Sequence, residues 1–592
     1  MSAAVLGLLL LVAQAQAPQR DTPAWQLSGT ATISGQVVSD EDPGRPIRLA
    51  KVLLSSAVLR RELMITSDSD GRFVFSRLPA GRYSLSVSKP GLVPTTYGAK
   101  RPGGAGVPIV IADGDQFPAT IRIARGAVIS GTVRDANGEP AAGVRISVLA
   151  YDVDSSGVRT LSLRTFSNTG NGLLLTDDRG AYRVYGLRPS EYYVQASTAI
   201  NSVGGRATSS AEVDWAQRAV AAQGGNPGAT PAPGQSVTIA PFLYPGTADP
   251  LQAVGIPLKQ GEERTGVDFA FSYVPTATIS GIIRGPGGAA PKLTQASLLR
   301  PNVSFGLGGG SAFIKPDADG RFTVANVLPG NYVMAVRGSM EASASAAQGP
   351  MAVASMPLWA MTELVVSGED VSGLELTLAP GFSVSGRLVF AGEKQPSPAE
   401  ISRVSVALTP HGATSMGAPT VLAQPDGTFS ITGVGPGEYK LYANLPSGAS
   451  AASPWSVRSA SVSGADGLDV PFRVQNDMDG AVITFTDRPT ELTGSLLDTD
   501  GKPALEYFIV VFPVDRSLWT PQSRRVRSAR PANTGSFRLA GLPPGEYYVC
   551  AMTDLEQNLL NTAGYLETLI PASIKFTLGE GEKKVQDLKI AR

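Results

Sequence analysis

The sequence predicts an all-β protein, a tandem array of about five β-sandwich modules, on three observations. Gly and Pro, which number 66 and 45 among 592 residues, are scattered along the chain in the manner of turn residues. Hydrophobic residues make up 43% of the chain, enough for packed cores, while charged residues make up only 17%. A two-part pattern recurs five times, which indicates repeated units and not one large domain.

The first part of the repeat is a predicted strand that carries Ser-Gly or Thr-Gly. Apolar residues follow each Gly at alternate positions, as Val37 follows Gly35, and this is the period of a half-buried strand. The five copies lie at residues 33–35, 129–131, 279–281, 384–386 and 492–494.

The second part begins with a Gly and reaches a Tyr twelve residues later in every copy. The distance from the first-part Gly to this Tyr varies instead from 48 to 61 residues, which indicates loops between rigid units. We expect a hairpin here: a Gly at positive φ, a strand, a Pro turn and a returning strand. The pairs are Gly71 and Tyr83, Gly180 and Tyr192, Gly320 and Tyr332, Gly427 and Tyr439, and Gly535 and Tyr547.

The Ser-Gly strands also give the expected module boundaries. The second module is the longest because it holds an insertion near 200–240, where 211–222 has helical character and 224–234 is a Gly- and Pro-rich loop. The predicted modules are 28–126, 127–274, 275–380, 381–487 and 488–592.

Residues 1–17 have the pattern of a signal peptide. An apolar run from Val5 to Val12 precedes Ala-Gln-Ala, so cleavage is expected after Ala15 or Ala17. The run is shorter than the ~20 apolar residues that cross a bilayer, and no second apolar segment of that length follows. We therefore expect export to the periplasm, the outer surface or the medium, with no transmembrane segment in the mature chain.

The repeat motifs together resemble a known family. Ile-Ser-Gly-x-Val at 33–37, Asp-Gly-x-Phe at 70–73 and Leu-Pro-x-Gly-x-Tyr at 78–83 are similar to the carboxypeptidase regulatory-like domain. That domain is a transthyretin-like (prealbumin-like) Greek-key β-sandwich, found beside metallocarboxypeptidase catalytic domains and in many bacterial surface proteins. The resemblance implies contact with carbohydrate or a surface polymer, and no catalysis by the module itself.

The residues give little sign of catalytic chemistry. With His411 as the single histidine and Cys550 as the single cysteine, the usual zinc sites cannot be assembled, and no cofactor or metal is predicted. No pair of carboxylates stands apart from the acids of the turns, as a glycosidase would need. The formal net charge is zero, which argues against nucleic acid as a partner. The Arg-rich run at 523–527 is expected to be solvated.

Tryptophans are the candidate ligand-binding residues. Trp455 and Trp519 stand near Pro or polar residues outside the hairpin unit, so we expect them to be exposed and able to stack on a sugar ring. We predict an exported, non-catalytic binding protein whose partner is a polysaccharide or an envelope protein. Two alternatives stay open: a structural spacer that presents other envelope components, and a hydrolase with its site between modules.

Strand alternation in the last module makes one further expectation specific. Tyr547 and Val549 should face the core, while Tyr548 and Cys550 should face the other way, because side chains alternate between the two faces of a strand.

Overall fold

The structure is a computed structural model, and it is predominantly β-strand, which confirms the all-β fold class. The predicted signal peptide at 1–17 lies outside the described residues, as does most of the Gly- and Pro-rich loop at 224–234. The described residues are 29–153, 159–164, 174–198, 205–206, 208–221, 229, 236–288, 292–300, 311–339, 357–393, 395–411, 418–445 and 455–590.

Each repeat folds into two sheets, a Ser-Gly sheet that contains the Ser-Gly strand and a second sheet that packs on it. In module 1 the Ser-Gly sheet has the order β4-β1-β8, and the second sheet has the order β3-β2-β5-β6 with β7 also paired to β5. The bounds are β1 (Ala31–Ser39), β2 (Lys51–Ser55), β3 (Leu63–Thr66), β4 (Arg72–Leu78), β5 (Gly81–Ser88), β6 (Thr95–Thr96), β7 (Ile109–Ile111) and β8 (Gln116–Ile123).

Module 2 repeats this plan and adds an insertion. Its Ser-Gly sheet has the order β13-β9-β19 and its second sheet the order β11-β10-β14-β17, while β15-β16-β21 form a small extra sheet. The helix predicted at 211–222 is confirmed as α1 (Ser210–Ala221). The remaining bounds are β9 (Ala127–Arg134), β10 (Arg145–Val153), β11 (Arg159–Leu163), β12 (Leu174–Leu175), β13 (Ala181–Leu187), β14 (Ser190–Ser197), β15 (Gly205–Arg206), β16 (Ser236–Ile239), β17 (Phe242–Leu243), η1 (Pro250–Gln252), β18 (Ile256–Leu258), β19 (Glu263–Arg264), β20 (Phe269–Ala270) and β21 (Tyr273–Pro275).

Module 3 has the sheets β25-β22-β28 and β24-β23-β26-β27-β29, and module 4 has β33-β30-β38-β35-β36 and β32-β31-β34-β37. The bounds in module 3 are β22 (Ala277–Arg284), η2 (Pro286–Gly288), β23 (Lys292–Leu299), β24 (Ser311–Phe313), β25 (Arg321–Val327), β26 (Gly330–Ser339), β27 (Pro357–Val366), β28 (Val371–Thr377) and β29 (Ala379–Pro380). Those in module 4 are β30 (Phe382–Ala391), α2 (Pro398–Ile401), β31 (Ser405–His411), β32 (Val421–Leu422), β33 (Thr428–Val434), β34 (Gly437–Asn444), β35 (Ser456–Val462), β36 (Ala465–Asp466), β37 (Phe472–Val474) and β38 (Met478–Thr486).

Module 5 has the sheets β42-β39-β45 and β41-β40-β43-β44, with β46 also paired to β39. A short helix, α3, covers the face of its second sheet that is turned away from the core of the module. The bounds are β39 (Glu491–Leu497), β40 (Phe508–Pro513), η4 (Arg516–Leu518), β41 (Arg527–Ala529), β42 (Ser536–Ala540), β43 (Gly545–Met552), η5 (Gln557–Asn561), α3 (Ala563–Leu569), η6 (Ile570–Ala572), β44 (Ile574–Leu578), β45 (Lys583–Val585) and β46 (Leu588–Lys589).

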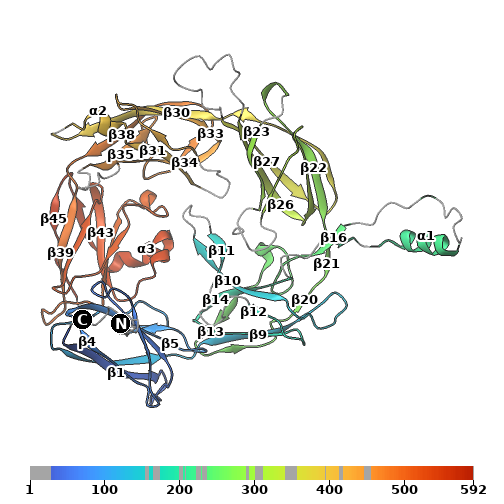
Figure 1. Ribbon diagram of the computed structural model, residues 1–592. Helices are drawn as coiled ribbons and strands as arrows, with labels where there is room; N and C mark the ends of the chain where they lie inside the picture. The colour runs from blue at the N-terminus through green and yellow to red at the C-terminus, as the bar shows by residue number, and fades with distance from the viewer. Residues whose placement is uncertain are drawn as a thin grey trace, which may run out of the picture.

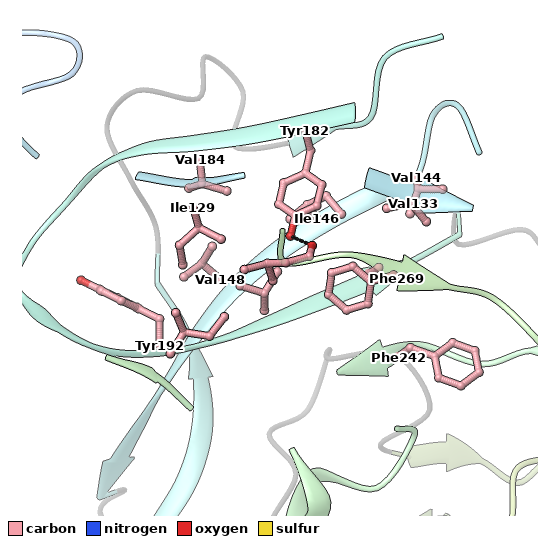
Figure 2. Close-up of a cluster of buried hydrophobic side chains, with 14 of the residues drawn as sticks. Ile129, Val133, Val144, Ile146, Val148, Tyr182, Val184, Tyr192, Phe242 and Phe269 are labelled. Atoms are coloured by element: carbon pink, nitrogen blue, oxygen red, sulfur yellow. Dashed lines mark hydrogen bonds between the residues drawn. The ribbon is translucent and has the colours of Figure 1, made fainter. Parts of the chain in front are cut away.

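A separate hydrophobic core lies between the two sheets of each repeat. The buried clusters span 31–123, 277–378, 384–485 and 492–588 in modules 1, 3, 4 and 5. Figure 2 shows the core of module 2, where Ile129 of β9 and Val184 of β13 lie opposite Ile146 and Val148 of β10. The domain boundaries stay a prediction, since they concern which segments fold on their own.

The glycine of each Ser-Gly strand is required by a close approach of the next strand. In module 1, a Cβ at Gly35 would lie 1.8 Å from the carbonyl oxygen of Ala119 on the parallel strand β8. The same contact recurs at the other four glycines, where the distance is 2.0–2.1 Å. No side chain fits there, so the parallel strand can pair closely only with glycine. The glycines and the residues whose carbonyl oxygens face them are Gly131 and Val267, Gly281 and Leu374, Gly386 and Ala481, and Gly494 and Gln586.

An aromatic residue pairs with each of these glycines across the antiparallel ladder, and in modules 1 and 5 its ring lies directly against the glycine. The residue two positions after the turn glycine pairs with the strand glycine across the antiparallel ladder, as Phe73 pairs with Gly35. In Figure 2 the hydroxyl group of Tyr182, which pairs with Gly131, donates a hydrogen bond to the carbonyl oxygen of Val267 at 2.6 Å. The other three pairs are Gly281 with Phe322, Gly386 with Phe429, and Gly494 with Phe537.

The turn glycine of the repeat has the positive φ that the sequence predicts, with φ of 72° at Gly71 and 70–85° in the other copies. Its carbonyl oxygen accepts a hydrogen bond from the Ser-Gly strand, at 2.8 Å from the amide nitrogen of Val37 in module 1. The equivalent bond has the same length in all five modules. This bond joins the two parts of the repeat, although loops of variable length separate them in the sequence.

The predicted hairpin is wrong, because its two strands belong to different sheets. β4 pairs with β1 in the Ser-Gly sheet, whereas β5 pairs with β2 in the second sheet. The Pro turn therefore carries the chain across the sandwich. The hydroxyl group of the repeat Tyr fixes this crossing by donating a hydrogen bond to a backbone carbonyl four residues earlier, from Tyr83 to Pro79 at 2.7 Å. The same bond recurs from Tyr192, Tyr332, Tyr439 and Tyr547 at 2.6–3.1 Å.

The parity predicted for β43 is confirmed. Tyr547 and Val549 are fully buried in the core of module 5. Cys550 belongs to a second buried cluster on the opposite face of the sheet, with Tyr548 packed against that cluster.

The five modules are arranged in a ring, with the Ser-Gly sheets toward the outside and the second sheets toward the centre (Figure 1). Modules 1 and 5 close the ring: Arg101 forms ion pairs with Asp554 and Glu556, and Arg82 donates to the carbonyl oxygen of Pro531 at 2.7 Å. Because the first module contacts the last, the array is not an extended string.

Consecutive modules also make direct contacts around the ring. Gln260 of module 2 donates to Asp40 of module 1 at 2.8 Å, and Leu328 of module 3 packs in the core of module 2. The indole of Trp359 in module 3 donates to the carbonyl oxygen of Gly433 in module 4 at 2.5 Å.

We predict that Gly494→Ala destabilises module 5 by on the order of 3 kcal/mol, because the added methyl group meets a backbone carbonyl that cannot move without breaking the parallel pairing. Gly564→Ala is the matched control. Gly564 lies in α3 with no atom within 4 Å of an added Cβ, so this change should leave stability unchanged or raise it by up to about 1 kcal/mol. Hydrogen exchange of module 5 peptides in the full chain measures both. Equal protection in the two variants contradicts the close-approach argument.

Candidate functional site

The junction between modules 4 and 5 is built around a buried carboxylate. The side chain of Asp469 is 2% exposed and receives hydrogen bonds from the Nε atoms of Arg524 and Arg525, each at 2.7 Å. Arg525 also donates to the hydroxyl group of Tyr547 at 3.2 Å, so it links Asp469 of module 4 to the repeat tyrosine of module 5. The backbone carbonyls of Val457 and Arg458 also accept hydrogen bonds from Arg524, at 2.9 and 2.8 Å.

The two guanidinium groups keep Asp469 ionised. Burial by itself would raise the pKa of Asp469, but the hydrogen bonds and charges of Arg524 and Arg525 outweigh burial and lower the pKa below its ordinary value. For Arg525, burial acts in the opposite sense and the attraction of Asp469 overcomes it, so the pKa is raised. The site holds a paired, charged carboxylate at the junction between two modules.

The expectation that the Arg-rich run at 523–527 is solvated is therefore wrong for Arg524 and Arg525, whose side chains are 23% and 14% exposed. The run pairs with a residue 55 positions earlier in the chain, which no local pattern of charge could indicate. Arg527, at the start of β41, is exposed.

A cleft of about 640 Å³ lies beside this junction and is lined by both modules. Strand β34 supplies one wall. Alternation along this strand buries Tyr439 and Leu441 in the core of module 4, while Lys440 and Tyr442 lie on the opposite face and line the cleft. Further lining residues are Thr409, His411, Asn444, Trp455, Leu468, Asp469, Phe485, Gln522, Arg524 and Arg527.

The same strand position is covered in module 5 and open in module 4. Tyr548 and Cys550 follow the repeat Tyr547 at the positions where Lys440 and Tyr442 follow Tyr439. In module 5 this face packs under Leu566 and Leu569 of α3. In module 4 it lines the cleft, and Tyr442 is 50% exposed.

The two candidate tryptophans differ in exposure and in position. Trp455 is half-buried in the wall of the cleft, where it packs edge-on against Phe390 with 5.1 Å between ring centroids. Trp519 is 7% exposed, and its indole donates to the carbonyl oxygen of Pro513 at 2.7 Å. The expected exposure of Trp519 is wrong, because the α3 cluster covers its ring. Ligand binding by these tryptophans stays a prediction. Of the two, Trp455 lines the cleft and Trp519 does not.

Lys440 and Tyr442 were not predicted as site residues from the sequence, although their spacing from Tyr439 indicates which face of the strand they occupy. Both stand an odd number of positions after the repeat Tyr439, which places them on the outward face of a strand. That rule says which face they occupy and not whether another element covers it. The single histidine, His411 at the end of β31, also lines the cleft.

A second junction cavity of about 850 Å³ lies where modules 1, 2 and 5 meet. Arginines line it, but Arg101 is paired with Asp554 and Glu556, and Arg164 with Asp152 at 3.4 Å. The pairs of Arg101 join module 1 to module 5, whereas the pair of Arg164 with Asp152 lies within module 2. The cavity therefore borders the contact that closes the ring.

Within the described ranges, no group of three His, Cys, Asp or Glu side chains is placed to hold a metal ion. No helix in the described part of the chain has the length and apolar character needed to cross a membrane.

Comparison with known families identifies the first module. Residues 32–122 match the model of the carboxypeptidase regulatory-like domain. Module 1 is a carboxypeptidase regulatory-like domain. This match confirms the resemblance drawn from the repeat motifs. The other four modules have the same arrangement of two sheets as module 1.

Comparison with solved structures returns pilins at low similarity. The minor pilin GBS52 of Streptococcus agalactiae is 13% identical with a TM-score of 0.21, over 42% of this chain and 98% of the pilin. The streptococcal ancillary pilin is 14% identical with a TM-score of 0.19, over 59% and 99%. The shaft pilin spaA of Lactobacillus rhamnosus GG is 9% identical with a TM-score of 0.19, over 41% and 97%. Values this low say nothing about what the chain binds. No curated protein matches the chain.

We predict that Asp469→Asn loosens the junction between modules 4 and 5 by about 3–5 kcal/mol, because it leaves two partly buried guanidinium groups without a counter-charge. Glu393→Gln is the control, since Glu393 pairs with Arg488 at the surface, where both side chains are at least 64% exposed. This control should cost less than about 1 kcal/mol. Hydrogen exchange of the peptides on both sides of the junction reports the difference, and a similar loss in both variants refutes the assignment.

We also predict that acid weakens this junction. The pKa of Asp469 is lower in the folded protein than its ordinary value of about 3.9, so its stabilisation is complete above about pH 4 and is lost as pH falls through the folded pKa. The measurement is junction protection from pH 7 to pH 2 in the wild type and in Asp469→Asn. The acid-dependent loss at the junction should be smaller in Asp469→Asn, and an identical profile would show that another group controls it.

Proposed function

We propose that this chain is an exported, non-catalytic binding protein that holds a carbohydrate chain in the cleft between modules 4 and 5. The observation that carries the proposal is the grouping of Trp455 and Tyr442 in one cleft with hydrogen-bonding side chains around them. Aromatic faces cover the apolar face of a sugar ring, and side chains such as Asn444 and Gln522 exchange hydrogen bonds with its hydroxyl groups.

The form of the cleft supports a chain-like ligand. About 640 Å³ is within the usual range for small-ligand sites, roughly 300–1,000 Å³, and is enough for a few sugar residues. The walls come from strands of one module and from loops of the next, so the cleft is shaped by the ring and not by one module. The export signal predicted at 1–17 would bring such a site to envelope or external polysaccharide.

The ring gives less support to the spacer alternative. A spacer gains reach from an extended array, whereas contacts such as that of Arg101 with Asp554 bring the first module against the last. The hydrolase alternative also gains no support from this cleft. Glycoside hydrolysis uses an acid whose pKa is raised, and the pKa of Asp469 is lowered by its two arginine partners.

We expect Trp455→Ala and Tyr442→Ala each to reduce retention of the full chain on insoluble neutral polysaccharide, and the double variant to abolish it. The reason is that the stacking of an aromatic ring on a sugar ring is worth about 1 kcal/mol for each contact. Tyr273→Ala is the matched control, since Tyr273 is 61% exposed on β21 and outside the cleft. Retention of a neutral glycan should change little between low and high salt, because stacking carries no net charge. Binding that survives in the double variant, or that Tyr273→Ala weakens equally, overturns the proposed site.

A further inference from the structure

The charges of the cleft are unbalanced. Among the described residues that line it, three are cations, Lys440, Arg524 and Arg527, and one is a carboxylate, Asp469. Asp469 already forms ion pairs with Arg524 and with Arg525, and Arg525 is not among the residues that line the cleft. The cleft thus presents positive charge that its own acid does not neutralise.

Lys440 is a partly buried cation whose charge is not paired within the described part of the chain. It is half-buried on β34, and its ammonium group donates one hydrogen bond, to the hydroxyl group of Thr520 in module 5 at 2.9 Å. No carboxylate of the described residues lies within ion-pair distance, and Thr520 in turn donates to the backbone carbonyl of Asp469 at 3.2 Å. An ammonium group has three donors, so two remain for a ligand on the cleft side.

Burial also makes the charge of Lys440 unfavourable without a close counter-charge. Loss of water lowers the pKa of Lys440, and the more distant charges of Asp469 and Asp466 only partly oppose the effect. An anionic group beside the ammonium would supply the missing counter-charge at short range and in a partly desolvated setting, where ion pairing is stronger than at the open surface.

Arg527 provides the second cationic contact. It is exposed at the start of β41 and lines the cleft, and no ion pair within the described part of the chain engages it. Its guanidinium group can hold two oxygens of one carboxylate or phosphate in parallel. Lys440 and Arg527 come from different modules, so an anion held by both would bridge the junction.

We propose that the cleft is selective for an acidic saccharide, one whose carboxylate or phosphate group is held by Lys440 and Arg527 while the sugar ring stacks on Trp455 and Tyr442. This inference rests on the proposed function and names the ligand class for the same site. It changes the expected salt response, because binding of an acidic chain weakens as salt screens the charges, whereas binding of a neutral chain does not.

The experiment compares polymers that differ only in charge. Affinity of the full chain is measured by calorimetry for polygalacturonate and for its methyl-esterified form, and in a second arm for phosphomannan and for dephosphorylated mannan. The charged member of at least one pair should bind ten-fold or more tightly than its neutral counterpart at low salt. The arm with the larger ratio identifies carboxylate or phosphate as the preferred group.

Substitutions then assign the selectivity to the cleft. Lys440→Gln with Arg527→Gln should lower affinity for the charged polymer to that of the neutral one and leave the neutral affinity unchanged. A glutamine at 440 keeps a donor for Thr520, and unchanged junction protection in hydrogen exchange shows that the variant is folded. Lys51→Gln, at an exposed position of β2 in module 1, is the matched control and should have no effect.

The outcomes separate the two proposals. Equal affinity for charged and neutral polymers, both lost on Trp455→Ala, overturns the acidic selectivity and keeps the proposed function. Preference for the charged form that survives in the double variant, or that Lys51→Gln reduces equally, means general charge attraction and overturns the inference. No binding to any of the four polymers contradicts both proposals.

Discussion

The architecture depends on one close approach, that of a parallel strand's carbonyl oxygen to the α-carbon of the Ser-Gly glycine. In each module this oxygen stands about 2 Å from where a Cβ would be, so a single methyl group would force the Ser-Gly sheet apart. The aromatic residue after the turn glycine fills the space beside it, as Phe537 does for Gly494. Motifs that are far apart in the sequence are thus parts of one contact.

The repeat tyrosine depends on that sheet and defines the second one. Before the tyrosine, the chain leaves the Ser-Gly sheet at a Pro turn, crosses the sandwich and begins a strand of the second sheet. The tyrosine hydroxyl group fixes this crossing by donating a hydrogen bond to a carbonyl four residues earlier. Two sheets held in this way form a rigid block with loops at defined ends. Rigid blocks can meet through charged junctions such as that of Asp469 with Arg524 and Arg525, and together they form a ring (Figure 1).

Differences between modules arise on the face that the repeat does not specify. The outward positions of the tyrosine strand hold Tyr548 and Cys550 in module 5 and Lys440 and Tyr442 in module 4. The first pair is apolar enough to pack under α3, whereas the second includes a charge whose burial is unfavourable. One fold therefore carries a covered face in module 5 and a face that lines a cleft in module 4.

The sequence by itself determined the all-β class, the fivefold repeat, the positive φ of the turn glycines and the parity of Tyr547, because each follows from spacing along a single strand or turn. Only the tertiary structure decided that the expected hairpin strands lie in different sheets, since alternation gives the faces of a strand and not its partner. It also decided that Trp519 is covered by α3 and that Arg524 and Arg525 pair with Asp469. These outcomes depend on contacts between residues far apart in the chain, where local periodicity carries no information.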